Sequence, residues 1–117
     1  RVSRYLPERL RKIVAERAGY RCEYCLLPES FAFYRFQVDH IISLKHGGLT
    51  VESNLAYSCV TCNNAKGSDI GTVLFPRREF VRLFNPRIDD WEAHFYVDET
   101  HIHPKTKIAK RLSNSLI

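Results

Sequence analysis

The sequence lacks the apolar segments that would place it in a membrane or direct it out of the cell. No apolar run approaches the roughly 18 residues that a membrane-spanning helix requires, although 44% of the residues are apolar. The amino-terminal stretch is charged and has no apolar core of the signal-peptide kind. These absences exclude a transmembrane class, and we expect a soluble protein with a cytoplasmic location.

Internal repeats and low-complexity linkers are also absent. A chain of 117 residues without them predicts one domain over residues 1–117, with a core small enough for a structural metal ion to add materially to its stability. Within this domain we expect a basic amino-terminal helix in residues 1–19, a core motif in residues 20–70 and a carboxyl-terminal extension in residues 71–117.

Cysteine does not occur outside two Cys-x2-Cys pairs, Cys22/Cys25 and Cys59/Cys62, which are separated by 33 intervening residues. Structural disulfides and a redox dithiol are the alternatives, but paired thiols at this spacing favour metal capture. Four thiolates fill a tetrahedral zinc site completely, so such an ion cannot bind water or substrate. The sequence therefore predicts a structural Zn2+ ion rather than a catalytic one.

The formal net charge is +5 and the isoelectric point is about 9.2. Seven basic residues but only two acidic ones lie in residues 1–21, so this arm carries the whole excess. Solvated helix faces would explain such charges, and so would contact with a polyanion such as nucleic acid.

Local patterns predict a short series of elements. We expect helices over residues 6–18, 60–66 and 107–115, strands over residues 31–42 and 54–57, a loop over residues 43–53, and a hairpin from residues 91–97 and 101–103. The central part is thus a β-loop-β-helix unit, and the expected class is α+β.

Three polar residues of this unit have side chains suited to phosphodiester hydrolysis. Asp39 offers a hard anionic oxygen for a divalent ion, and the side-chain carbonyl of Asn63 offers a neutral one. His40 can deprotonate water near neutral pH. Each residue alone is more typical of a turn or a helix cap, so the prediction depends on their joint spacing.

Together these motifs resemble the HNH endonuclease family, which has the ββα-metal (His-Me finger) fold. The resemblance covers about residues 22–67 and consists of Cys22-x2-Cys25, Val38-Asp39-His40-Ile41, Gly47-Gly48, Asn54-Leu55 and Cys59-x2-Cys62-Asn63-Asn64-x-Lys66-Gly67. The last motif position is often histidine in this family and is Asn63 here, which gives an H-N-N variant. The segments Leu83-Phe84-Asn85-Pro86-Arg87 and Trp91-x2-His94-Phe95 are similar to the extension of stand-alone bacterial HNH proteins.

The resemblance implies a metal-dependent endonuclease that hydrolyses DNA, most often double-stranded, and leaves 5′-phosphate and 3′-hydroxyl ends. Asp39 and Asn63 would bind the catalytic divalent ion, Mg2+ or alternatively Mn2+, while His40 acts as the base and Asn54 orients the histidine and its loop. Lys45, Lys66, Arg77 and Arg78 are candidates for holding substrate phosphates.

Two other functions fit parts of the pattern. A zinc-stapled nucleic-acid-binding module without activity would explain the cysteines and the basic arm, but it has no need of the Asp39, His40 and Asn63 set. A thiol-disulfide oxidoreductase would use Cys22 and Cys25, but the thioredoxin-like βαβ context of such enzymes is absent.

Overall fold

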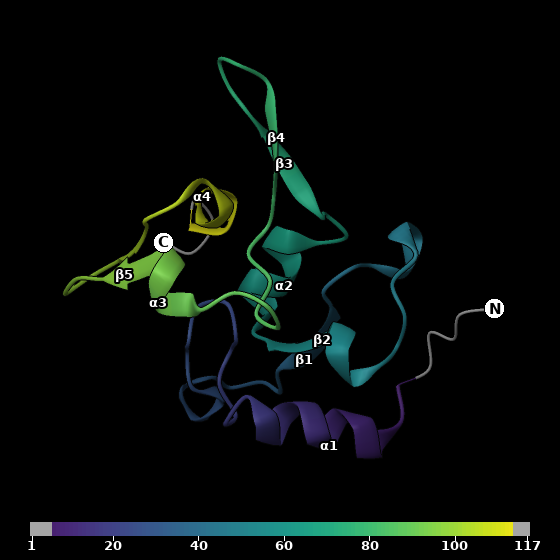
Figure 1. The fold of residues 1–117 in the computed structure, drawn as a ribbon. Coiled ribbons are helices and arrows are strands. Elements are labelled where there is room, and N and C mark those ends of the chain that lie inside the picture. The colour runs from purple at the N-terminus through teal and green to yellow at the C-terminus, as the bar shows by residue number, and fades with distance from the viewer. Residues whose placement is uncertain (1–5, 114–117) are drawn as a thin grey trace.

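The structure is a computed structural model that describes residues 6–113, with side chains through residue 110 (Figure 1). Arg1, Arg4 and the end of the helix predicted over residues 107–115 lie outside this part of the chain. The helices are α1 (Glu8–Arg17), α2 (Val60–Lys66), α3 (Trp91–His94) and α4 (Lys107–Ser113), with 3-10 turns at Glu29–Phe31, Leu44–His46 and Glu52–Asn54. The strands are β1 (Gln37–His40), β2 (Leu55–Ser58), β3 (Gly71–Leu74), β4 (Glu79–Arg82), β5 (Phe95–Val97) and β6 (Ile102–Pro104). No described helix is long and apolar enough to cross a membrane.

The centre of the molecule is the predicted β-loop-β-helix unit. β1 pairs with β2 in antiparallel register, with Asp39 opposite Ala56 and His40 opposite Leu55. Every residue of β2 is buried, and α2 follows it directly after Cys59. This unit joins the end of β1 to the start of α2, which is where the predicted site residues lie.

Helix α1 covers β2 from below in Figure 1. Its buried residues Leu10, Val14 and Ala15 follow the 3.6-residue spacing of one helix face. Arg17 fastens the helix to the β2 end by donating to the carbonyls of Glu52, at 2.9 Å, and Leu55, at 2.6 Å. The predicted helix over residues 6–18 is confirmed, with slightly narrower bounds.

The strand predicted over residues 31–42 is wrong over its first half, because only Gln37–His40 pairs. The carboxylate of Glu29 accepts hydrogen bonds from the Phe36 amide, at 2.6 Å, and from the Tyr57 hydroxyl, at 2.7 Å. This carboxylate turns the chain before β1. Phe31 and Phe33 are left exposed, so their aromatic character gave a false strand signal.

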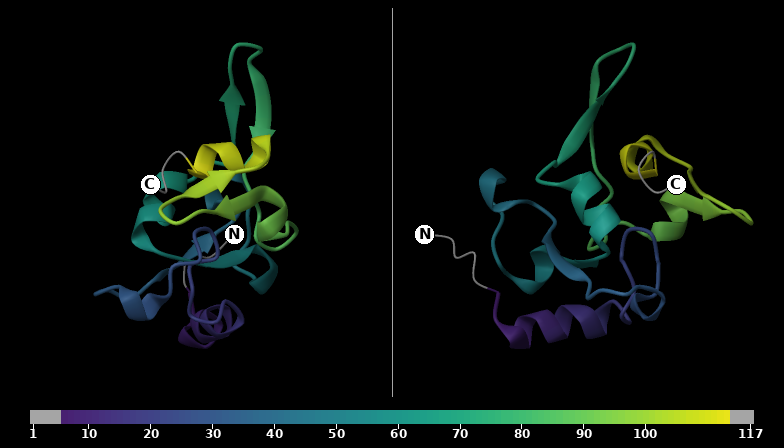
Figure 2. Two further views of the ribbon diagram at one scale, coloured as in Figure 1. Left: turned by 90° about the vertical axis from the view of Figure 1, so that its left-hand side faces the viewer. Right: turned by 180° about the vertical axis from the view of Figure 1, so that it is seen from behind.

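The carboxyl-terminal extension also differs in part from the expectation. Residues 91–94 form α3 instead of continuing a strand, and the hairpin consists of the shorter strands β5 and β6. A second hairpin, β3 with β4, was not predicted, because arginines alternate irregularly with its apolar residues. Figure 2 shows this hairpin standing away from the other elements in both views.

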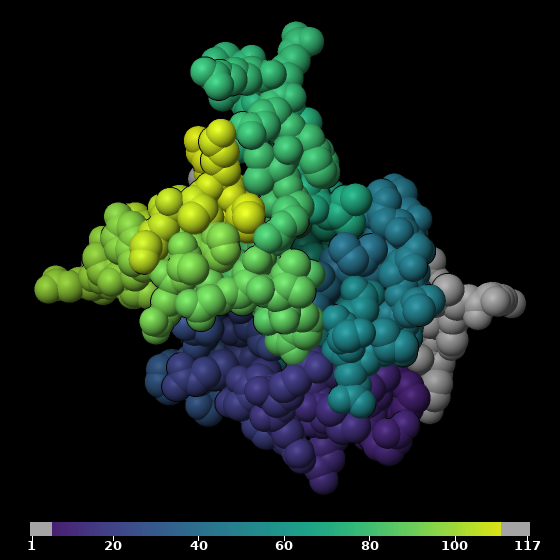
Figure 3. Space-filling view, viewed as in Figure 1, coloured from purple at the N-terminus to yellow at the C-terminus, as the bar shows by residue number. Residues whose placement is uncertain are grey.

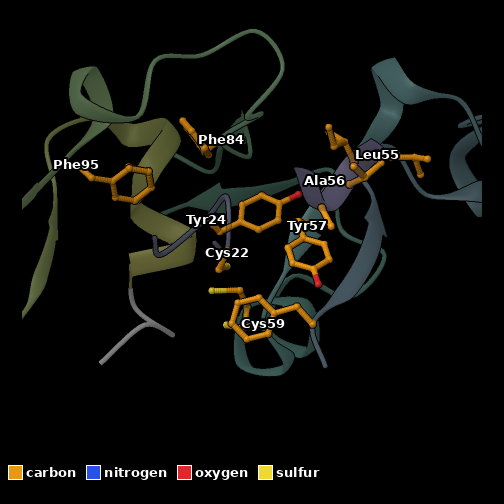
Figure 4. Packing of buried hydrophobic residues seen from close by; sticks show 14 of the residues in the cluster. Cys22, Tyr24, Leu55, Ala56, Tyr57, Cys59, Phe84 and Phe95 are labelled. Carbon is orange, nitrogen blue, oxygen red and sulfur yellow. The ribbon is translucent and has the colours of Figure 1, made fainter. Parts of the chain in front are cut away.

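One hydrophobic core joins the central unit, α1 and the extension (Figure 4). Tyr24 of the first cysteine turn packs edge-on against Phe84, which in turn contacts Phe95. The indole nitrogen of Trp91 donates to the Tyr24 carbonyl at 2.8 Å. The protein is thus a small α+β fold in which the extension completes the core.

Candidate metal and catalytic site

The four cysteines converge from two turns onto one point. Their sulfur atoms all lie within 4.8 Å of one another, and Cys25 Sγ is 3.8 Å from Cys59 Sγ. A tetrahedral zinc site with bonds of about 2.3 Å places its sulfurs about 3.8 Å apart, whereas a disulfide requires about 2.05 Å. All four thiols are free of disulfide bonds. The donor set and its spacing therefore fit zinc.

Local backbone geometry explains why the sulfurs converge. The first pair lies in a tight turn, in which the Leu26 amide donates to the Cys22 carbonyl at 2.8 Å and the Cys22 amide donates to the Leu27 carbonyl at 2.9 Å. Cys59 is the N-cap of α2, and its sulfur accepts from the Cys62 amide at 3.4 Å. Hydrogen bonds among the cysteines, first of all those with Cys22, lower the pKa of Cys59 and raise the pKa of Cys62.

A second site lies where the end of β1 meets α2. Asp39, His40 and Asn63 line one open cavity of about 350 Å³, together with Ser43 and Lys45. The structure thus brings together the three residues predicted for catalysis, from the end of β1 and the first half of α2. Ser43 Oγ is buried and has no hydrogen-bond partner among the described residues.

Asp39 is held tightly within the protein. Its side chain is only 6% exposed, and it accepts a hydrogen bond from the Tyr24 hydroxyl at 2.7 Å. Lys66 Nζ lies 3.2 Å from the carboxylate. Burial raises the pKa of Asp39, and the Lys66 charge and the Tyr24 hydrogen bond oppose this rise. A carboxylate has about four acceptor positions, so these partners leave room for a cation.

Lys66 was predicted to contact substrate phosphates, but the structure buries it beneath the site. Its side chain is 1% exposed, and its ammonium group contacts both Asp39 and the carbonyl of His40, the latter at 3.0 Å. A lysine so placed neutralises the carboxylate and fixes the end of β1 against α2. Its sequence position, at the last turn of α2, gave no sign of burial.

His40 is oriented by the loop that follows it. Its Nε2 lies 2.9 Å from Thr50 Oγ1, so the hydroxyl limits rotation of the ring. Asn54 holds the same loop by accepting from the Ile42 amide, at 2.8 Å, and donating to the carbonyls of Ile42 and Leu49, both at 2.9 Å. Gly48 fits beneath this clamp, because a Cβ there would lie 1.7 Å from the Ile42 carbonyl oxygen.

Asn63 is half-buried on α2, and its amide nitrogen donates to the Gln37 side chain. This contact positions the amide group at the edge of the cavity. Of the predicted phosphate contacts, Lys45 is exposed at the same cavity, whereas Arg77 and Arg78 lie in the turn between β3 and β4.

Sequence reasoning missed the residues that position this site: Gln37, Ser43, Thr50 and the hydroxyl of Tyr24. Ser43 and Thr50 lie in the loop over residues 43–53, and Tyr24 lies between Cys22 and Cys25, so no motif indicated a role for their hydroxyl groups. Gln37 alone carried a signal, because residues two apart on a strand share a face and Gln37 precedes Asp39 by two.

Residues 22–69 match the family model described as HNH endonuclease. The match covers both cysteine pairs and every residue of the predicted catalytic set, and it confirms the resemblance predicted from the sequence for this segment. Neither a curated protein nor a solved structure matches the chain. An HNH domain indicates a nuclease or nucleic-acid-binding role.

Proposed function

We propose that this protein, with its HNH domain at residues 22–69, is a metal-dependent endonuclease that hydrolyses DNA phosphodiester bonds. One observation supports the proposal above all others. Asp39, His40 and Asn63 line a single cavity beside a separate four-cysteine cluster. A protein that only binds nucleic acid has no physical need for a carboxylate, an imidazole and an amide around one opening.

The two metal functions are divided between two places. The cysteines hold structural zinc, which fixes the start of α2 relative to the first turn. Asp39 and Asn63 would hold the second, divalent ion, with Mg2+ or Mn2+ as the candidates. Such an ion supplies charge stabilisation for the phosphate and its leaving oxygen.

His40 is the proposed general base. Imidazole has an ordinary pKa of about 6.5, so it can accept a proton from water near neutral pH. Thr50 fixes the ring, and Asn54 fixes the loop that carries Thr50. His40 is the last residue of β1, so its imidazole lies at the strand end next to Asp39.

Lys45 and Lys66 have different proposed tasks. Lys45 is exposed at the cavity, where it can contact a phosphate oxygen of the substrate. Lys66 is buried against Asp39 and holds the carboxylate in place while limiting the net negative charge of the site. Lys45 thus serves binding, and Lys66 serves the arrangement of the site.

The test is cleavage of supercoiled plasmid after adventitious metal has been removed, with a panel of divalent ions added back. We expect cleavage with Mg2+ or Mn2+, and loss of cleavage in His40→Ala with zinc content and melting temperature unchanged. Nicked or linear first product reports whether one strand or both are cut. Full cleavage by His40→Ala would remove His40 as the base.

The rival function is a zinc-stapled nucleic-acid-binding module without catalytic activity. The observation that favours it is the Lys66–Asp39 ion pair, because a carboxylate bound to a buried lysine can be purely structural. DNA binding that survives chelation of Mg2+, without a nick under any of the ions, would support this rival.

A further inference from the structure

The β3–β4 hairpin is the part of the molecule that projects farthest from the core. Figure 3 shows it as a narrow projection above the rest of the surface. Its strands pair from Gly71 opposite Arg82 to Leu74 opposite Glu79. Residues 75–78 form the turn between them. Four residues of strand extend about 13 Å, which is enough to reach beyond the surrounding surface.

The two faces of the hairpin differ. One face carries Thr72, Leu74 and Val81, which are partly buried, and β4 packs on α4. The other face carries Val73, which is 44% exposed, directly opposite Phe80, which is 61% exposed. Phe75 in the turn is 74% exposed. Apolar side chains thus face solvent along the projecting hairpin.

The charges at the turn are all of one sign and lack partners. Arg77 and Arg78 are exposed, and neither forms an ion pair with any residue that the structure describes. The one acidic residue of the hairpin, Glu79, is paired with Lys107 at 2.8 Å. Arg82, at the base, is bound to Asp89 and anchors the hairpin instead.

Arg78 occupies a backbone conformation that favours glycine, because its φ is 58°. A residue with a side chain at such a position costs about 1 kcal/mol or more relative to an ordinary conformation. An arginine at this strained position places a second charge next to Arg77. The strain also makes Arg78→Gly a substitution that removes the charge and relieves the backbone.

We propose that this hairpin is a second DNA contact, which enters a groove of the duplex while Arg77 and Arg78 bind its phosphates. The inference rests on the proposed function, since it concerns the substrate of the same cavity. A two-stranded ribbon fits the major groove of B-form DNA, which is about 12 Å wide. The exposed rings then contact base edges, and the arginines contact the backbone.

The position of the hairpin relative to the cavity supports one continuous substrate. Gly67 and Ser68 line the cavity, and β3 begins at Gly71. Phe75 lies seven positions after Ser68, a span of at most about 25 Å. One turn of duplex DNA measures about 34 Å. The hairpin turn therefore lies close enough to the cavity to contact the same duplex within one helical turn of a phosphate bound there.

Charge favours DNA over a second copy of this chain as the occupant. Two hairpins brought together would face their unpaired arginines toward each other, on proteins that each carry a net charge of +5. Double-stranded RNA is disfavoured because its major groove is too narrow and deep for side chains to read. Both remain outcomes that the experiment can distinguish.

The test measures binding of a fluorescent 30-base-pair duplex across a salt series, with all variants in a His40→Ala background so that the DNA stays intact. We expect Arg77→Ala/Arg78→Gly to raise Kd about ten-fold or more. The slope of log Kd against the logarithm of salt concentration should fall by about 2, one unit for each lost phosphate contact. Phe75→Ala should raise Kd without changing the slope, because an apolar contact releases no counterions.

The matched control is Arg35→Ala/Lys105→Ala, which removes the same charge from two exposed positions outside both the hairpin and the basic arm over residues 1–21. An equal effect of this control on Kd and slope would overturn the inference, as would unchanged binding by the hairpin variants. Loss of a dimer in those variants, or equal affinity for double-stranded RNA, would also overturn it.

A second readout separates this inference from the proposed function. With His40 present, hydrolysis of bis(p-nitrophenyl) phosphate should be the same with and without the hairpin substitutions, because this small ester cannot reach the turn. Failure of the proposed function would appear as no hydrolysis of ester or plasmid by the natural sequence. Failure of the hairpin inference would leave both activities and DNA affinity unaffected by the substitutions.

Discussion

Asn54 connects both ends of the loop over residues 43–53 through one side chain. It makes three hydrogen bonds with main-chain atoms of Ile42 and Leu49. The same loop carries Thr50, the partner of His40. The Asn54 side-chain amide therefore contributes both to the order of the loop and, through Thr50, to the orientation of the imidazole.

We predict that Asn54→Ala lowers the free energy of unfolding by about 1–3 kcal/mol, because two carbonyls and one amide lose their partner. Plasmid cleavage should fall by more than the folded fraction does, since His40 loses its orientation. Urea unfolding and initial cleavage rates measure the two effects. Asn64→Ala, at an exposed position of α2, is the control and should change neither.

Lys66 and Asp39 form the most buried ion pair of the described residues. We predict that Lys66→Met destabilises the protein by about 3–5 kcal/mol at pH 7, because it leaves a buried carboxylate without its counter-charge. Asp39→Asn/Lys66→Met should recover part of this loss, since the remaining group is neutral. Thermal unfolding of the two variants provides the measurement, and equal stability of Lys66→Met and the natural sequence would contradict the structural role.

At the scale of elements, Asp89 connects the base of β4 to the segment before α3. Arg82 donates to both of its oxygens, at 2.7 and 2.8 Å, and the Asn85 amide donates at 2.8 Å. These contacts, first of all the Arg82 hydrogen bonds, lower the pKa of Asp89. A carboxyl group with a lowered folded pKa adds stability above its unfolded pKa and loses it as pH falls through the folded value.

We therefore predict that Asp89→Asn is less stable than the natural sequence at pH 7, and that the difference shrinks from about pH 4 downward. Urea unfolding at pH 7 and at pH 3 tests the sign. Asp90→Asn is the control, because the Asp90 side chain makes no capping hydrogen bond in the structure. A difference that grows in acid would contradict this account of Asp89.

The extension is needed by the segment that matches the HNH family. Tyr24 of the first cysteine turn packs against Phe84, and the indole nitrogen of Trp91 donates to the Tyr24 carbonyl. We predict that a fragment of residues 20–70 binds zinc but unfolds without a cooperative transition, because it lacks Phe84, Phe95 and the α1 face. Calorimetry of the zinc-loaded fragment measures this, and a sharp transition like that of the full chain would contradict it.

Over the whole molecule, the features that the sequence predicted are those that follow from a local residue spacing. The cysteine pairs, α2 and the apolar face of α1 depend on local patterns, and the structure has them where expected. The β3–β4 hairpin and the start of β1 were not predictable in this way. The first depends on packing against α4, and the second depends on the Glu29 carboxylate, both of which are tertiary contacts.

The candidate site shows the same division. The positions of Asp39, His40 and Asn63 around one cavity follow from strand and helix lengths together with the family motif. The burial of Lys66 against Asp39 does not, because a lysine near a helix end is usually exposed. The pairing of charges within the site is therefore set by contacts between residues that are distant in the sequence.

Zinc is expected to hold the whole fold together. The core that contains Val14 and Phe84 also contains Cys22, Cys59 and Cys62. Loss of the ion would remove the zinc–sulfur bonds that hold these close-packed thiols together. We predict that a strong chelator unfolds the chain and that added zinc refolds it. Circular dichroism during the titration measures this, and an unchanged spectrum in the metal-free protein would contradict it.

The central claim is that a zinc-stapled fold presents Asp39 and Asn63 to a second, different ion beside His40. The most direct measurement is crystallography of the protein grown with Mn2+, with anomalous maps recorded at the zinc and manganese absorption edges. The account predicts zinc among the four sulfurs and manganese between Asp39 and Asn63. Manganese absent from that cavity, or a cysteine cluster bonded as disulfides without zinc, would contradict it.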